Sequence, residues 1–402
     1  MTFDEVFTYE NLYKAYRLCL KGVRWKGTVQ HYQQTSITNL TKTLKELREG
    51  SFKTGNFFRF TIMERGKLRH IKSVGIAERV VQRCLCDNYL VPVLSQEFIY
   101  DNSACTQGKG YHFAIKRCLY HLRKYYKKHH TNEGYILQYD FHHYFDTIPH
   151  DKLIAAVSKF TTDERLNKIY AQLVNDFEGD CGLGLGSQIS QISALFYPNK
   201  IDHYFKSIKG VESYARYMDD GYIISSDKEL LRSLKKELTR MVSELGLTLN
   251  EDKTQIRKIQ AGFTFLKGRF KLTPSGKAIV KPCRKNVTKN RRKAKKMIQK
   301  GFPLEEITKF VDIVVGNYKH YNAYFTIKNF KEEVKMAIKT QYPYIDEKGV
   351  AHEDLVKTYS DEGYDIIQLP TYRLYKEAVD RYPCKYEYVE NVPEGEEVGG
   401  EA

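Results

Sequence analysis

Two adjacent carboxylates interrupt an otherwise apolar part of the chain and restrict how it can fold. The segment YARYMDDGYIISS places Asp219 and Asp220 between two short runs of apolar and aromatic residues. Neighbouring side chains of an extended strand point to opposite faces, so two consecutive acids fit best where the chain turns. The pattern predicts a hairpin whose tip directs one or both carboxylates at one point. A solvated Asp-Asp-Gly turn is the alternative, because Asp and Gly are favoured turn residues.

A third acid ends a separate apolar stretch. Residues 134–141, GYILQYDF, predict a short buried strand that ends in a carboxylate, Asp140. Catalytic groups often lie at such a sheet edge, although a cap or turn would also use an Asp. Asp140 and Asp219 together suggest a site for two Mg²⁺ ions, which prefer carboxylate and phosphate oxygens. Two ions about 3.5–4 Å apart can activate a hydroxyl and stabilise a leaving pyrophosphate.

The charge balance favours a polyanionic partner. The 402 residues contain 65 Lys and Arg against 49 Asp and Glu, a net charge of +16. Each phosphate that such a surface neutralises releases counterions, and the 31 tyrosines and 21 phenylalanines offer rings on which bases can stack. A solvated basic surface is the alternative. Residues 284–300 concentrate this charge, with nine Lys or Arg and no acid.

Several other classes of protein are disfavoured. No stretch approaches the roughly 20 apolar residues of a membrane helix, and the acidic start MTFDEVF is unlike a signal peptide. The eight cysteines are scattered without a C-x-x-C pair, which favours reduced thiols over a zinc cage or a disulfide framework. We therefore expect a soluble cytoplasmic protein of two or three packed subdomains, with no membrane partner.

Helical and strand patterns alternate along the chain. Apolar spacing predicts helices at residues 11–22, 37–50, 76–96, 110–127, 151–176, 186–206 and 228–246, and further helices within 284–300 and 303–338. Residues 56–73, with a turn at Arg65-Gly66, and residues 262–272 read as hairpins. The acidic, glycine-rich residues 391–402 read as a loose tail. This order of elements predicts an α+β or α/β body.

Several segments, in one order along residues 8–335, resemble the sequence motifs of reverse transcriptases. Tyr217-Met218-Asp219-Asp220 matches their Y-x-D-D motif, and Asp140 to Phe145 resembles their first palm motif. The other matching segments are GKLRHIKSVGIAERVVQ, FIYDNSACTQGKGYHFAI, Gly186-x-x-x-Ser190-Gln191, Asn250-x-x-Lys253-Thr254 and Phe265-Leu266-Lys267-Gly268. The resemblance implies an α+β right-hand polymerase. Its expected parts are fingers at residues 1–135, palm at 136–280, helical thumb at 281–340 and an extension at 341–402.

The resemblance also implies roles for individual residues. Asp140, Asp219 and Asp220 would hold two Mg²⁺ ions, with Mn²⁺ as a possible substitute, and Lys253 would protonate or neutralise the leaving pyrophosphate. Nucleotide contacts are implied for Lys67, Arg69, Phe145, Gly186 and Gln191, with Phe145 excluding a 2′-hydroxyl by its bulk. Primer or template contacts are implied for Tyr217, His112, Phe265, Leu266, Gly268, Arg291 and Arg292. Core packing, a turn or a solvated surface is the alternative at the positions outside the acidic cluster.

The middle motif departs from the common pattern. Many reverse transcriptases have Gln-Gly at its start, whereas this chain has Leu185-Gly186 and closes the motif with Ser190-Gln191. That form resembles enzymes of diversity-generating retroelements and of bacterial phage defence. The missing glutamine would contact nucleotide and template, so we expect lower copying fidelity.

These observations predict an RNA-directed DNA polymerase. Its expected partners are an RNA template, dNTPs and the DNA product, with a dedicated noncoding RNA and an accessory protein or a second copy of the chain as further possibilities. Template-independent or protein-primed synthesis by the same palm is one alternative. A non-catalytic RNA-binding scaffold is another, which the retention of three clustered carboxylates disfavours, because like charges held together are unfavourable without a metal.

Overall fold

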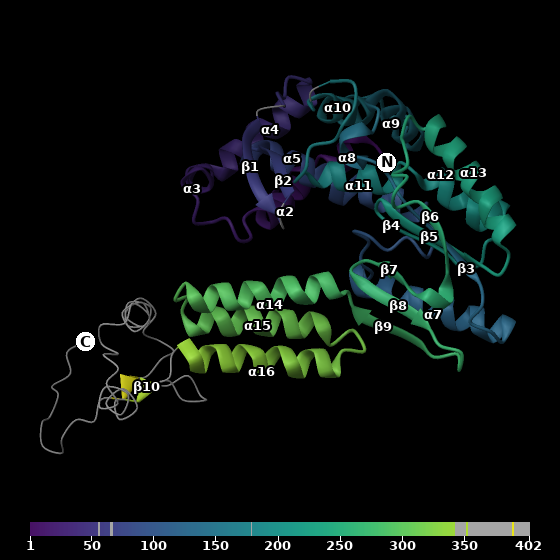
Figure 1. Ribbon diagram of the computed structural model, residues 1–402. Coiled ribbons are helices and arrows are strands. Elements are labelled where there is room, and N and C mark those ends of the chain that lie inside the picture. The colour runs from purple at the N-terminus through teal and green to yellow at the C-terminus, as the bar shows by residue number, and fades with distance from the viewer. Residues whose placement is uncertain (55–56, 65–66, 178, 342–350, 353–387, 390–402) are drawn as a thin grey trace, which may run out of the picture. The chain divides into compact units, whose positions relative to one another are not determined.

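The computed structural model describes residues 1–54, 57–64, 67–177, 179–341, 351–352 and 388–389 (Figure 1). Most of the expected extension and the whole expected tail lie outside the described residues. The chain divides into two compact units, one of residues 1–262 with 272–278 and one of residues 263–271 with those from 279 onward. No helix in the described part of the chain is long and apolar enough to cross a membrane. The expected boundaries of fingers, palm and thumb stay predictions.

A four-stranded antiparallel sheet carries the acidic residues in the first unit. Its strand order is β4-β5-β3-β6. The strands are β3 (Tyr135–Asp140), β4 (Tyr214–Tyr217), β5 (Asp220–Ser225) and β6 (Gln255–Lys258). Leu137 of β3 pairs with Ile223 of β5, and both are fully buried. Burying these apolar residues fixes the register, because a slip of one residue would turn every side chain to the other face.

Two long helices pack against this sheet. In α13 (Lys228–Glu244) the buried residues are Leu231, Leu234, Leu238 and Val242, a stripe at helical spacing. Asp227 caps its first turn, and Gly246 follows its end with a φ of 74° that suits glycine. On α7 (Tyr111–His129), the ring of His121 lies 2.9 Å from the hydroxyl of Tyr222 on β5. Both helices therefore hold the strand that begins at Asp220.

The remaining elements of the first unit precede β3, lie between β3 and β4, or follow β6. The N-terminal ones are α1 (Phe3–Val6), α2 (Tyr9–Cys19), α3 (Gly27–Gln34), α4 (Ser36–Glu49), the antiparallel hairpin β1 (Phe57–Glu64) and β2 (Lys67–Val74), α5 (Ile76–Leu85), a π-helical turn (Cys86–Leu90) and α6 (Val91–Gln96). Those between β3 and β4 are α8 (Tyr144–Thr147), α9 (His150–Val157), a 3₁₀ turn (Ser158–Phe160), α10 (Glu164–Asn175), α11 (Gln188–Phe196), α12 (Asn199–His203) and a π-helical turn (Tyr204–Ile208). A 3₁₀ turn (Ile259–Ala261) follows β6. The expected hairpin at 56–73 is present, and its Arg65-Gly66 turn lies outside the described residues.

The helix expected over residues 186–206 is not continuous. It breaks between α11 and α12 at Pro198, which has no backbone N–H to donate within a helix and whose ψ of 18° departs from helical values. The helix expected over 151–176 is likewise interrupted by the 3₁₀ turn and the residues after it. The sequence predicted a single helix in each place because the three- and four-residue spacing of apolar residues continues across each break.

The second unit combines a small sheet with three helices. The sheet has the order β7-β8-β9, with β7 (Phe263–Phe265), β8 (Gly268–Leu272) and β9 (Ala278–Pro282). The helices are α14 (Arg284–Gln299), α15 (Leu304–Tyr318) and α16 (Tyr324–Gln341). Ile298, Ile307 and Phe330 lie in their shared core, and Arg291 of α14 pairs with Glu333 of α16 at 3.1 Å. Beyond these helices, β10 (Ala351–His352) pairs in parallel with β11 (Tyr388–Val389).

Candidate active site

The Asp219 carboxylate lies on the turn that joins β4 to β5. Tyr217 pairs with Asp220, which leaves Met218 and Asp219 as a two-residue turn. Met218 has a φ of 56°, as tight hairpin turns require. The backbone N–H of Phe141 donates to the carbonyl of Asp219 at 3.3 Å and ties this turn to the end of β3.

Asp140 and Asp220 lie directly opposite each other on the antiparallel pair β3 and β5. Like charges in such a pair are destabilising, and Asp140 is also 96% shielded from solvent, with an exposure of 4%. Burial, together with the charges of Asp219 and Asp140, raises the pKa of Asp220 from 3.8 to about 7. Burial also raises the pKa of Asp219, and the charge of Asp140 adds to this shift. The three carboxylates thus share one site at a cost to stability.

Lys253 supplies a positive charge to this cluster. Its Nζ donates to Oδ1 and Oδ2 of Asp140 at 2.9 and 2.6 Å. Partial burial opposes the charged ammonium, but the hydrogen bonds to Asp140 together with the charges of the three carboxylates outweigh it and raise the pKa of Lys253. The loop that carries Lys253 is fixed to β3, because the N–H of Asn250 donates to the carbonyl of Asp140 at 2.8 Å. The Asn250-x-x-Lys253 motif therefore reaches Asp140 across a separation of 113 residues.

The chemistry of this donor set fits divalent cations. Asp140, Asp219 and Asp220 offer carboxylate oxygens, which hard ions such as Mg²⁺ prefer. Burial and the neighbouring carboxylates raise the pKa values of Asp219 and Asp220, and a bound divalent cation would oppose both shifts. As the side chains stand, no three Asp, Glu, His or Cys residues of the described chain are arranged around a single ion position. Lys253 donates to both oxygens of Asp140, so an ion bound there would either share these oxygens with the ammonium or displace it.

The acidic cluster makes stability depend on pH. Because Asp220 has a folded-state pKa of about 7 against 3.8 when exposed, the folded state binds the extra proton between these values. The contribution of Asp220 to stability without metal is therefore fully present below pH 3.8, decreases as the pH rises, and is lost above about pH 7. We expect Asp220→Asn to melt at a higher temperature than wild type at pH 8 in EDTA, and the gap to close on acidification. Thermal melts across pH test this, and a pH-independent gap would contradict it.

A glycine-rich loop packs beside the end of the first palm motif. The N–H of Leu183 donates to the carbonyl of Phe145 at 2.7 Å, and the N–H of Gly182 donates to that of Ile148 at 2.9 Å. Gly186 has a φ of 103°, a conformation that side chains disfavour, and a Cβ there would lie 3.7 Å from Ile71 of β2. The loop thereby brings Gly186 to the β1–β2 hairpin, while Phe145 is half-buried on α8.

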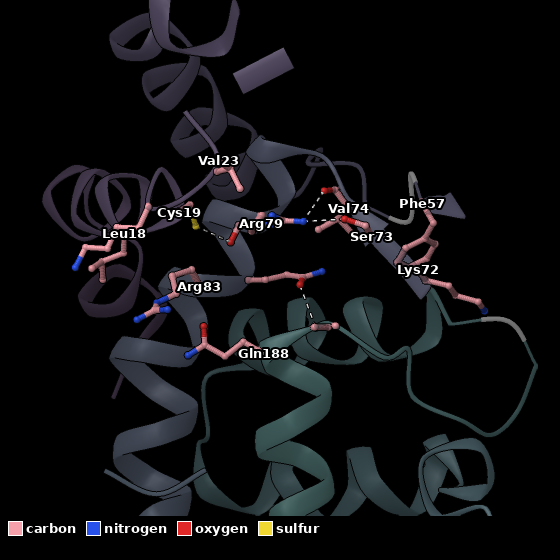
Figure 2. Close-up of a pocket in the computed structure, with 14 residues that line it drawn as sticks. Leu18, Cys19, Val23, Phe57, Lys72, Ser73, Val74, Arg79, Arg83 and Gln188 are labelled. Atoms are coloured by element: carbon pink, nitrogen blue, oxygen red, sulfur yellow. Dashed lines mark hydrogen bonds between the residues drawn. The ribbon is translucent and has the colours of Figure 1, made fainter. Parts of the chain in front are cut away.

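A positively charged pocket of about 310 Å³ lies beside this loop (Figure 2). Its cations are Lys21, Lys72, Arg79 and Arg83, and no acidic residue lines it. Figure 2 shows Arg79 directed at Ser73, to whose hydroxyl it donates at 2.8 Å, while Arg83 pairs with Asp87 at 2.5 Å. The sequence analysis missed this pocket. The spacing of Arg79 and Arg83 on one face of α5 was the available signal, but their convergence with β2 required the tertiary structure.

The other residues with expected roles lie in different places. Tyr217 is half-buried at the end of β4, His112 lies in the first turn of α7, and Gln191 is exposed on α11. The side chains of Lys67 and Arg69 lie outside the described part of the chain, although their backbone belongs to β2. In the second unit Leu266 lies in the β7–β8 turn and Gly268 begins β8, while Phe265 is buried against Phe270. Arg291 and Arg292 lie on α14. The nucleotide, primer and template roles of these residues stay predictions.

A buried ion pair that the sequence analysis missed supports the Met218-Asp219 turn. Arg216 and Asp202 are both fully buried, and the guanidinium donates to the carboxylate at 2.8 Å through Nε and 2.6 Å through Nη2. The Nη1 of Arg216 donates to the carbonyl of Met218, and its Nη2 donates to that of Leu195 on α11, each at 2.9 Å. A cation between apolar neighbours in the YARY segment was the signal available. The pair connects α11, α12 and the acidic turn.

Opposed carboxylates on the antiparallel strands β3 and β5, with Lys253 reaching Asp140 from the loop before β6, are the arrangement expected of a polymerase palm. Residues 53–269 match the family model of the reverse transcriptase, an RNA-dependent DNA polymerase. This match covers more than half of the 402 residues, and the chain belongs to the reverse transcriptase family. The expected fold class, α+β with the right-hand plan of a polymerase, is confirmed.

Two further similarities accompany this match. The chain is 25% identical to the protein YkfC of Escherichia coli K12 over 251 residues, which is 51% of this chain and 64% of YkfC. The chain therefore spans less than two thirds of that relative. The structure is also similar to apo telomerase from Candida tropicalis truncated from its C-terminal domain, with a TM-score of 0.43, 16% identity and 60% of each chain covered.

Proposed function

We propose that this protein is an RNA-directed DNA polymerase that makes cDNA by two-metal nucleotidyl transfer. The observation that supports it is the cluster of Asp140, Asp219 and Asp220, which gathers three acids at a cost to stability and adds Lys253 beside them. In this reaction the 3′-hydroxyl of a primer bonds to the α-phosphorus of a dNTP while the bond to pyrophosphate breaks. Positioning and charge neutralisation carry most of such catalysis.

The three carboxylates would hold two Mg²⁺ ions, with Mn²⁺ as a substitute. When bound, these ions would supply charge stabilisation for the attacking and leaving oxygens. Phe145 would lie under the sugar of the incoming nucleotide and reject a 2′-hydroxyl by its bulk. Gly186 and Gln191 would contact the nucleotide, and Lys67 and Arg69 its triphosphate, where charge-assisted hydrogen bonds are strong.

Lys253 would donate a proton to the leaving pyrophosphate. Its hydrogen bonds to Asp140 raise its pKa, so it stays protonated at neutral pH in the free enzyme. We expect Lys253→Gln to lower kcat by about 10²-fold, as the loss of a positioned general acid does, and to remove the alkaline limb of the pH–rate profile. A matched control is Lys258→Gln, which changes an exposed lysine of β6. An unchanged pH profile in Lys253→Gln would contradict the proton-donor role.

The proposed reaction is tested directly by synthesis from bound RNA. The protein, purified with the RNA that accompanies it, is supplied with dNTPs and Mg²⁺ or Mn²⁺, beside an Asp219→Ala/Asp220→Ala variant, and the product is sequenced. DNA complementary to the RNA that only the wild type makes would support the proposal and identify the template. Product without a template match would replace it with template-independent or protein-primed synthesis. No product from either protein despite bound RNA would favour the non-catalytic scaffold.

The biological role we propose is copying of a dedicated noncoding RNA, in phage defence or in a diversity-generating retroelement. The middle motif supports this, because Leu185 stands where many reverse transcriptases have glutamine and Ser190-Gln191 closes the motif. We also propose that Leu185, in place of that glutamine, lowers copying fidelity. Equal error rates for the wild type and a Leu185→Gln variant, measured by sequencing products from one template, would contradict that link.

A further inference from the structure

Helix α7 presents a row of exposed cations. Its 19 residues include six Lys or Arg and no acid. Lys116, Arg123 and Lys127 are all exposed, and their spacing places them along one face over about 16 Å at 1.5 Å per residue. The ion pairs of this helix involve other residues, since Glu212 pairs with Lys124 and Lys128 at 3.1 and 3.3 Å. Within the described chain, no acid pairs with the three exposed cations.

Two aromatic rings are held in place beside this row. The guanidinium of Arg117 lies 4.9 Å from the ring centre of Tyr100 and 4.3 Å from that of Tyr120. Asp101 anchors Arg117 through a 2.6 Å contact, and Lys109 lies over the Tyr100 ring at 4.9 Å. Tyr100 and Tyr120 nevertheless remain 63% and 46% exposed. Both rings are therefore ordered before any ligand binds, which reduces the entropy lost on stacking.

Part of the charge on α7 is unfavourable for the helix itself. Arg123 and Lys127 are four residues apart, a spacing at which like charges repel. In α13, by contrast, acids stand beside the cations, and Arg232 pairs with Glu229 while Arg240 pairs with Glu237 and Glu244. An anionic ligand would relieve the repulsion on α7. Fixed aromatic rings interleaved with cations are the combination that binds unpaired nucleic acid, because bases stack on the rings while cations contact phosphates.

The position of α7 connects this surface to the polymerase site. Its first turn lies near β4, where Tyr111 influences the pKa of Tyr217, and its last turn lies near Glu133, to whose carbonyl Tyr125 donates. In its middle, His121 contacts Tyr222, which shares a sheet face with Asp220 two residues earlier. The helix thus follows the sheet from the end that carries the carboxylates to the opposite end.

We propose that Lys116, Arg123, Lys127, Tyr100 and Tyr120, the α7 basic face, bind unpaired RNA that continues from the copied template. This inference rests on the proposed function for the choice of RNA, because in reverse transcription the DNA product is paired with its template and the unpaired flank is RNA. The cations contact its phosphates, and the two tyrosine rings stack on its bases.

Binding is measured by fluorescence anisotropy with a fluorescein-labelled oligo(U) strand across a series of KCl concentrations. We expect Lys116→Gln/Arg123→Gln/Lys127→Gln to weaken binding at least about tenfold. The slope of log K against log salt is expected to fall by about 2, because each lost phosphate contact on a single strand removes roughly 0.7 from it. Tyr120→Ala is expected to lose about tenfold, whereas Tyr120→Phe keeps its affinity because the ring remains. Ultraviolet crosslinking of 4-thiouridine RNA is expected to label the α7 peptide.

The matched control is Arg232→Gln/Lys236→Gln/Arg240→Gln on α13, which removes the same charge from another exposed helix face. Its affinity and salt slope are expected to stay near those of wild type. The proposal would be overturned if the α7 variant lost no more affinity for oligo(U) than this control does. It would also be overturned if the α7 variant lost as much affinity for an oligo(dT) strand as for oligo(U). The assay requires no DNA synthesis, so an inactive polymerase would refute the proposed reaction without deciding this binding surface.

Discussion

We expect Asp219→Asn to reduce templated DNA synthesis by at least about 10³-fold, because it removes a carboxylate charge that would otherwise hold the divalent ions. At about 1.4 kcal/mol per tenfold, this loss of rate corresponds to several kcal/mol of transition-state stabilisation. The substitution keeps the size and shape of the side chain on the β4–β5 turn. It also removes one of the charges that raise the pKa of Asp220. The variant is therefore expected to be at least as stable as wild type in EDTA while it loses activity.

The control for this prediction is Asp146→Asn, the same chemical change at an exposed acid on α8. Single-nucleotide extension of a defined primer gives kcat for both variants, and thermal melts in EDTA give their stability. Comparable activity of Asp219→Asn and Asp146→Asn would rule out a catalytic role for Asp219. A loss of activity together with a lower melting temperature would instead indicate a structural role.

We expect Arg216→Met to destabilise the protein by about 3–5 kcal/mol, because it leaves the carboxylate of Asp202 buried without a cation. Both side chains are fully buried, and Arg216 also donates to the carbonyls of Met218 and Leu195. Chemical denaturation followed by circular dichroism measures the change. Arg257→Met, on β6 of the same sheet, is the control, and this exposed residue is expected to cost less than about 0.5 kcal/mol.

A double variant separates stability from positioning. Asp202→Leu/Arg216→Met removes both buried charges, and such replacements are often close to neutral. We expect it to recover most of the lost stability but not the activity, because the carbonyl of Met218 still lacks its donor and the acidic turn is less firmly held. Full recovery of kcat in the double variant would show that Arg216 only neutralises Asp202. A midpoint of Arg216→Met equal to that of wild type would contradict the buried pair itself.

Local patterns in the sequence were enough for the elements that lie close to the chemistry. Short apolar runs predicted β3 and the β4–β5 hairpin, and Gly50 and Gly246 follow the ends of α4 and α13 as expected. These features depend on neighbouring residues, whose preferences the sequence shows directly. The same reasoning failed at residues 186–206, where the apolar spacing continued across Pro198 although the helix could not.

The sequence by itself determined that the chain carries ordered polymerase motifs, three candidate carboxylates and a strong positive charge. Only the tertiary structure decided that Asp140 lies opposite Asp220, that Lys253 reaches Asp140, and that Arg216 is buried against Asp202. Strand register and long-range ion pairs depend on which apolar faces are buried together. Packing over the whole sheet determines which faces are buried together, and no local pattern of residues specifies it.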